Sequence, residues 1–168
     1  MMRKWIAILL ALTALVAFAA CGGTDPDDDA AEAYSFLFDG TEIRPGDKAA
    51  PVLEALSAHN PQSSVKASCL SGVTGEDVTY VLPGFRIQTF RLQEGDADEQ
   101  IRLIIFSDDS VATREGIAIG ATAQAVKDVY GAADEETEFR LAYTRGTMRL
   151  VFGLRDGSVT NISYETLE

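Results

Sequence analysis

Short extended segments separated by turn residues fill the chain from residue 34 onward, and they limit its possible folds more than any other feature. Residues 85–89 alternate apolar and polar side chains, as expected for a strand with one buried face. Asp156-Gly157 stands between two such segments and predicts a tight hairpin. The segments predicted as strands are residues 34–38, 64–70, 77–82, 85–89, 101–106, 138–144, 147–154 and 158–164. Segments of this kind favour an antiparallel sheet.

Two segments with helical spacing interrupt the strands. Apolar residues recur every three or four positions from 49 to 56, and Asp47 before them is the predicted helix cap. A second helix is predicted over residues 123–130, with Thr122 as its cap and Gly131 just past its end. Both predicted helices are short, so each covers only a small part of a sheet.

The two halves of this region look alike. Ile43-Arg-Pro-Gly46 aligns with Ile117-Ala-Ile-Gly120, and the glycine that ends each segment precedes a predicted helix. We therefore expect an α+β fold over residues 34–168. It would be a single domain of two diverged repeats, at about 34–110 and 111–168, each with one helix and three strands. The two short helices would lie on one face of an antiparallel sheet.

The N-terminus predicts export from the cytoplasm. Arg3 and Lys4 precede a nearly continuous apolar run that ends at residue 20. The run is shorter than the about 20 residues that span a bilayer, and it fits the apolar core of a signal peptide over residues 1–20. The junction Ala20-Cys21 follows two further small or apolar residues and resembles the lipobox of bacterial lipoproteins. A plain signal peptide or an uncleaved anchor is the alternative.

The lipobox resemblance implies cleavage between Ala20 and Cys21 and acylation of Cys21, with palmitate among the fatty acids. Two or more acyl chains hold a protein stably at a bilayer. Residues 21–33 then form the lipidated cysteine and an acidic, flexible tether. The expected location is the extracytoplasmic face of the cell membrane. Because Gly22 stands where Asp would retain a lipoprotein, the outer membrane is expected in a double-membraned host.

The charge balance excludes several classes of partner. The chain has 14 Lys and Arg against 26 Asp and Glu, a formal net charge of −12. Removal of the predicted signal, which holds two basic residues and no acidic one, makes this −14. Such a surface repels nucleic-acid phosphates and gives no attraction to anionic lipid. We expect no nucleic-acid partner, and membrane attachment only through the lipid.

The second predicted helix carries a family resemblance. Gly120-Ala-Thr122-Ala-Gln-Ala-Val126-Lys-Asp-Val-Tyr130-Gly131 resembles a signature of small envelope lipoproteins. These include the outer-membrane assembly lipoproteins of the SmpA and OmlA type and the tandem-repeat β-lactamase inhibitory protein. Residues 34–168 also resemble a group of lipoproteins from anaerobic Gram-positive bacteria. The resemblance implies a sheet that binds proteins and performs no catalysis.

Few residues suit catalysis or metal binding. His59 is the only histidine, and Cys69 is the only cysteine besides Cys21. A thiol enzyme would need this pair in contact with an orienting third group, and the sequence around Cys69 shows no such motif. The alternative roles for Cys69 are those of a half-buried structural residue and of an oxidisable thiol. With one histidine, no two-histidine zinc spacing is possible, and Cys69 stands alone. We expect no enzyme activity, no cofactor and no metal.

The arginines are the best candidates for binding. Three of them alternate with apolar residues on predicted strands, namely Arg86, Arg102 and Arg149. If Ile87, Leu103 and Leu150 face the helices, these arginines project from the open face of the sheet. Arginine suits ion pairs at protein interfaces. Pairing with acids on neighbouring strands is the other interpretation.

The expected function is that of a membrane-anchored extracytoplasmic binding module. Its open sheet face would take another envelope protein or a cell-wall-associated ligand. A scaffold component of an envelope-assembly complex is the alternative, and an extracytoplasmic thiol enzyme using Cys69 and His59 is the remote one.

Overall fold

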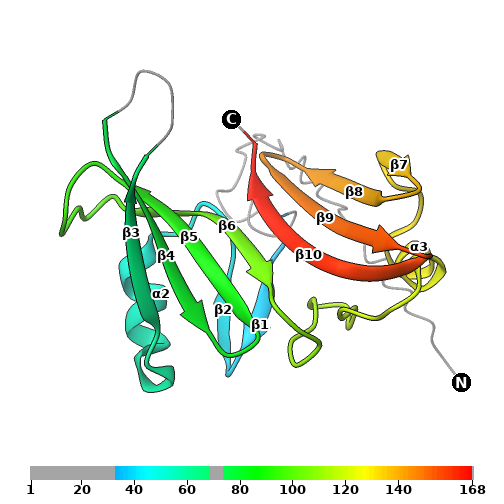
Figure 1. The fold of residues 1–168 in the computed structure, drawn as a ribbon, viewed down its shortest axis with the longest axis horizontal. Coiled ribbons are helices and arrows are strands. Elements are labelled where there is room, and N and C mark those ends of the chain that lie inside the picture. Colours follow the sequence, from blue (N-terminus) through cyan, green and yellow to red (C-terminus); the bar gives the residue numbers. More distant parts are fainter. Residues whose placement is uncertain (1–32, 69–73, 168) are drawn as a thin grey trace, which may run out of the picture.

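The computed structural model describes residues 33–68 and 74–167 (Figure 1). The predicted signal, the acylation site at Cys21 and nearly all of the tether lie outside these residues, and so does Cys69.

Ten strands make up most of the regular secondary structure of the described chain. Two of them form a small antiparallel sheet, β1 (Phe36–Phe38) and β2 (Thr41–Ile43). The others form one antiparallel sheet in the order β3-β4-β5-β6-β10-β9-β8-β7. Their bounds are β3 Gln62–Ala67, β4 Glu76–Leu82, β5 Phe85–Arg91, β6 Gln100–Phe106, β7 Glu135–Thr137, β8 Arg140–Arg145, β9 Met148–Arg155 and β10 Ser158–Thr166.

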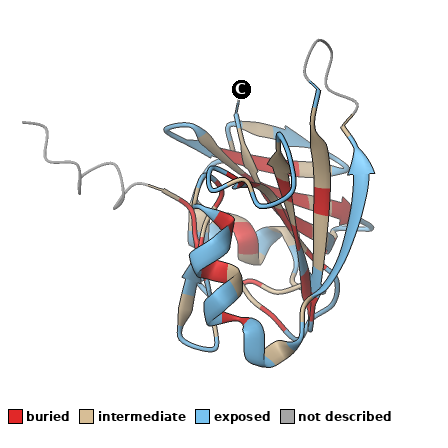
Figure 2. Ribbon diagram, turned by 90° about the vertical axis from the view of Figure 1, so that its left-hand side faces the viewer, coloured by how far each residue is buried: buried red, intermediate tan, exposed pale blue. Residues whose placement is uncertain are grey.

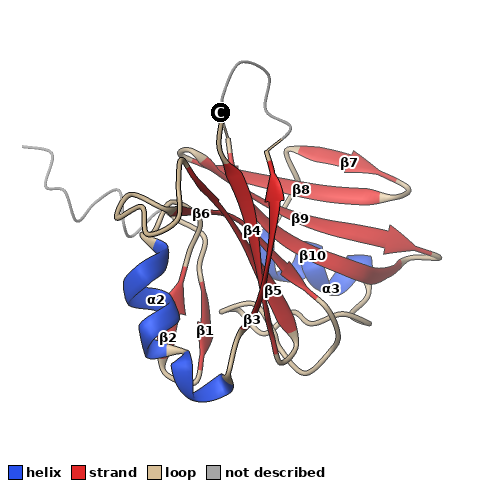
Figure 3. Ribbon diagram, turned by 60° about the vertical axis from the view of Figure 1, so that its left-hand side comes forward, coloured by secondary structure: helices blue, strands red, loops and turns tan. Residues whose placement is uncertain are grey.

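Helices are a small part of the fold. They are α2 (Ala49–Ala55), the short 3-10 helix η1 (Ser57–His59) and α3 (Ala123–Tyr130). In the view of Figure 1 the eight-stranded sheet lies in front of α2, the β1–β2 hairpin and α3. The helices and the hairpin therefore share one side of the sheet, and Figure 3 shows that α2 and α3 lie far apart.

The predicted fold class is wrong. The chain is mostly β, with an eight-stranded antiparallel sheet and a second, two-stranded one, and it is not a tandem α+β repeat of one helix and three strands. Asp39-Gly40 closes the hairpin Phe36–Ile43 outside the main sheet, and the acidic segment Glu135–Thr137 adds an unpredicted edge strand. The helices have seven and eight residues, too few to form a layer of their own.

Only one of the two predicted helix caps is correct. Thr122 accepts a hydrogen bond at its Oγ1 from the backbone N–H of Ala125 at 3.1 Å, and α3 has the predicted bounds. Asp47 does not cap α2, whose N-cap is Lys48. The Asp47 carboxylate instead accepts from the backbone N–H of Arg44 at 3.1 Å. The turn before α2 uses this carboxylate and leaves the helix without a side-chain cap.

The core fills the space between the sheet and the elements behind it. Phe36 of β1 has no exposed surface and packs edge-on against Phe85 and Phe106, with ring centroids 4.9 and 5.0 Å away. Val126 is the buried residue of α3, and Val52 is one of those of α2. Alternate residues of β4, β5, β6, β8, β9 and β10 enter this core, so the other residues of these strands face the opposite side of the sheet.

The tyrosines of this core make the fold sensitive to alkali. Burial and a hydrogen bond to Glu99 raise the pKa of Tyr80 to about 12, and burial is the main cause that raises the pKa of the other four. Above pH 10 the unfolded chain loses tyrosine protons that the folded chain keeps, so the free energy of unfolding falls as pH rises toward 12. We expect tyrosinate absorbance to appear together with the loss of circular dichroism. Tyrosinate forming around the ordinary pKa in a chain that stays folded would contradict this.

The open face of the sheet as candidate site

The open face is the side of the eight-stranded sheet that points away from the helices and the β1–β2 hairpin. It carries all three predicted arginines: Arg86 on β5, Arg102 on β6 and Arg149 on β9. Arg86 is exposed between the buried residues Phe85 and Ile87. No described element packs over this face, since the core residues lie on the other side. The binding role of these arginines stays a prediction.

The charge of the open face is opposite to that of the whole chain. Strand alternation adds three basic residues to the predicted ones, namely Lys66, Arg140 and Arg155. The acidic residues that alternation places there are Asp77, Glu135 and Glu165. Basic side chains therefore outnumber acidic ones on this face, whereas the chain has 26 acidic against 14 basic residues.

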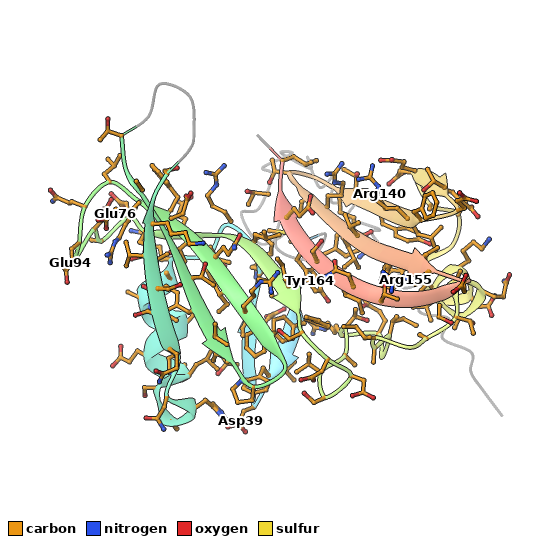
Figure 4. The ribbon with its side chains drawn as sticks, in the orientation of Figure 1. Asp39, Glu76, Glu94, Arg140, Arg155 and Tyr164 are labelled. Atoms are coloured by element: carbon orange, nitrogen blue, oxygen red, sulfur yellow. The ribbon has the colours of Figure 1, made fainter. Side chains whose placement is uncertain are left out.

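Arg140 was not predicted as a binding residue, although its sequence carries the same signal as that of Arg86. Arg140 precedes the buried Leu141 in a predicted strand, as Arg86 precedes Ile87. Figure 4 shows Arg140 on β8 and Arg155 at the end of β9. Both lie well away from Glu76 and Glu94, which are at the opposite end of the sheet.

Two ion pairs hold part of the open face in place. Arg149 Nη2 donates to Glu165 Oε2 at 2.9 Å, and both side chains are about one third exposed. Arg140 donates to Glu135, and this hydrogen bond lowers the pKa of the Glu135 carboxyl. Beneath these pairs, Ala142 and Val151 are buried on the open side. The two ion pairs fix the directions of the arginine side chains, so this end of the face is preorganised.

A hollow of about 550 Å³ lies on the other half of the open face. Its lining residues come from β3, β4, β5, β6 and β10: Lys66, Ala67, Asp77, Thr79, Gln88, Thr89, Arg102, Leu103, Glu165 and Thr166. The guanidinium carbon of Arg102 lies 5.8 Å from the centre of the Phe90 ring. Arg102 is thus fixed over an aromatic face at the rim, a cation–π contact.

A β-bulge explains why Leu103 faces the hollow. The sequence pattern placed Leu103 on the helix side, opposite to Arg102. In the structure Gln88 pairs with Leu103 and the next residue, Thr89, pairs with Ile101, so Arg102 is the extra residue of a bulge. Arg102 and Leu103 consequently both line the hollow. Ile101 and Ile104 supply the core contacts instead.

The histidine has a local structural role. His59 Nε2 lies 3.1 Å from Asp39 Oδ2, and its ring packs on Phe38 with centroids 4.8 Å apart. These contacts join the end of η1 to the β1–β2 turn. Cys69, the other half of the possible thiol pair, lies outside the described residues.

The described residues contain neither a cluster of metal ligands nor a helix that could span a membrane. Within residues 33–68 and 74–167, histidine, cysteine and carboxylate side chains nowhere gather in a group of three that could hold a metal ion. Among these same residues, no helix has the length and apolar character needed to cross a membrane.

Comparison with protein-family models, with curated proteins and with solved structures finds no match. The resemblance of the 120–131 segment to envelope lipoproteins stays an expectation from the sequence.

Proposed function

We propose that this chain is a lipid-anchored, extracytoplasmic binding module without catalytic activity, and that its open face binds an acidic surface of another envelope protein. The observation that carries the proposal is the excess of basic side chains on the one sheet face that no described element covers. The anchor is the acylated Cys21 that the lipobox-like sequence predicts.

The mixture of side chains on this face favours a protein partner. Val81 is 50% exposed there, and Leu103 and Ile105 are half-buried between Arg86 and Arg102. Apolar side chains flanked by arginines are typical of the residues that contribute most to protein interfaces. A bare anionic polymer would use the charges and leave the apolar residues in water.

A photo-crosslinking experiment in intact cells tests the proposal. A benzophenone amino acid replaces Val81 on the open face of the full chain, and a control chain carries it at Leu37, which is 60% exposed and lies in the β1–β2 hairpin on the other side. We expect an adduct only from position 81, with the crosslinked peptide of the partner rich in Asp and Glu.

Charge reversal supplies the specificity of the test. Arg86→Glu together with Arg102→Glu is expected to lower the adduct yield about tenfold or more, because like charges then face each other. Arg114→Glu is the matched control, since this side chain is 65% exposed and pairs with Glu42 away from the open face. Equal yields from the reversed chain and the control chain would overturn the proposal. Cys21→Ser is expected to release the chain from the membrane fraction.

A further inference from the structure

Along its outer edge, strand β3 presents a row of backbone groups with which no described strand pairs. It ends the eight-stranded sheet, pairs over six residues with β4 alone and has every residue exposed. Figure 2 shows it as a pale blue strand beside strands with buried residues. The opposite edge, β7, has only three residues. A six-residue exposed edge is a ready template for another strand.

The register of β3 with β4 shows which of its backbone N–H and C=O groups point toward the open edge of the sheet. The N–H of Ser68 donates to the carbonyl of Gly75 at 2.9 Å, and this pair continues the register of β3 with β4. Hydrogen-bonded pairs alternate along an antiparallel ladder, so Ser64 and Lys66 direct their N–H and C=O groups toward β4. Ser63, Val65 and Ala67 direct theirs toward the open edge.

We propose that β3 pairs with β3 of a second copy of this chain, antiparallel and about a two-fold axis, with Val65 opposite Val65. In this register Ser63 lies opposite Ala67, so all three outward-facing residues exchange backbone hydrogen bonds with their counterparts. The dimer joins two eight-stranded sheets edge to edge. The proposal does not depend on the open face or its partner.

Other registers are less favourable. Placing Ser64 opposite Ser64 sets Ala67 against Pro61, which has no N–H to donate. Placing Lys66 opposite Lys66 brings like charges together. With Val65 on the axis, Lys66 lies opposite Ser64 and no charges of like sign face each other directly.

The side chain of Val65 favours a second copy over an unrelated strand. Val65 is 47% exposed, although it lies on the same side of the sheet as the buried Val78. The two-fold axis brings the two Val65 side chains together, so the same apolar surface is covered on both copies. The only charge on the strand is that of Lys66, so the excess acidity of the chain is not concentrated at this contact.

Cysteine crosslinking of the full chain in its membranes tests the register, with Cys69→Ser as background. Opposed residues of such a pair lie within disulfide range. We expect Val65→Cys to give a covalent dimer in about tenfold higher yield than Val81→Cys, a site of similar exposure. We also expect Ser64→Cys to crosslink to Lys66→Cys when the two chains are mixed, and only weakly to itself. A Val65→Cys chain that gives no dimer, or an adduct with another protein, would overturn the proposal.

A proline variant tests the same edge without a crosslink. The N–H of Val65 points away from β4, so Val65→Pro should keep the β3–β4 ladder and remove donors only from the dimer contact. In sedimentation of the detergent-solubilised full chain, we expect the dimer fraction to fall while circular dichroism is unchanged. A dimer that survives this change would show that the copies meet elsewhere.

Discussion

Replacing Phe36 with alanine is expected to lower the free energy of unfolding by about 3–5 kcal/mol. The side chain is fully buried, and besides Phe85 and Phe106 it stacks on Tyr164, with centroids 6.0 Å apart. It joins the β1–β2 hairpin to β5, β6 and β10. Removing the ring leaves a cavity among groups that cannot close around it, because the sheet fixes three of its walls.

Leu37→Ala is the matched control for this change. Leu37 is the next residue in β1 and is 60% exposed, so its truncation should alter the stability by about 0.5 kcal/mol or less. Denaturant unfolding followed by circular dichroism measures both variants. Equal losses from the two substitutions would show that the hairpin does not contribute to the core in the way described.

Most of the strands were predictable from the sequence because each of these carries its own signal, and the short strands β2 and β7 were not. Alternation in residues 85–89 and the Asp156-Gly157 turn depend only on neighbouring residues, and the structure has a strand or a hairpin at both places. Hairpins join residues close in sequence, so a local pattern is enough to place them.

The arrangement of the strands was not predictable in the same way. The pairing of β6 with β10 joins Ile104 to Tyr164, far apart in the sequence, and no local pattern indicates it. The similar halves suggested a helix-and-strand repeat, but short helices and additional strands gave a mostly β fold. The bulge at Arg102 likewise depends on the neighbouring strand, so alternation within β6 gave Leu103 the wrong face.

Glu99 shows the same limit for a single residue. It ends an acidic stretch, Glu94 to Glu99, which the sequence pattern indicates as a solvated loop. In the structure Glu99 is only 9% exposed. Thr89 Oγ1 donates to Glu99 Oε1 at 2.5 Å, and Tyr80 Oη donates to the same oxygen at 3.0 Å. Composition marks the run as acidic, and only the tertiary contacts distinguish its last member.

Glu99→Leu is therefore expected to lower the free energy of unfolding by about 3 kcal/mol, since buried polar groups lose their acceptor. The groups affected are the hydroxyls of Thr89 and Tyr80 and the guanidinium of Arg91, whose Nη1 lies 3.9 Å from Glu99 Oε2. Arg91 keeps its other partner, Glu76 Oε2 at 2.9 Å from Nε. The backbone carbonyl of Glu99 still accepts from Ala49, so the loop should stay attached.

Three measurements separate this network from a general effect of losing an acid. Asp98→Asn, at a side chain 82% exposed, should change the stability by about 0.5 kcal/mol or less. Adding Thr89→Val to Glu99→Leu should restore part of the loss, because the stranded hydroxyl is removed with its partner. The pKa of Tyr80 should fall below its value of about 12 in Glu99→Leu, since the hydrogen bond and the negative charge disappear while burial remains. A Glu99→Leu protein as stable as Asp98→Asn, with the Tyr80 pKa unchanged, would show that these side chains do not act together.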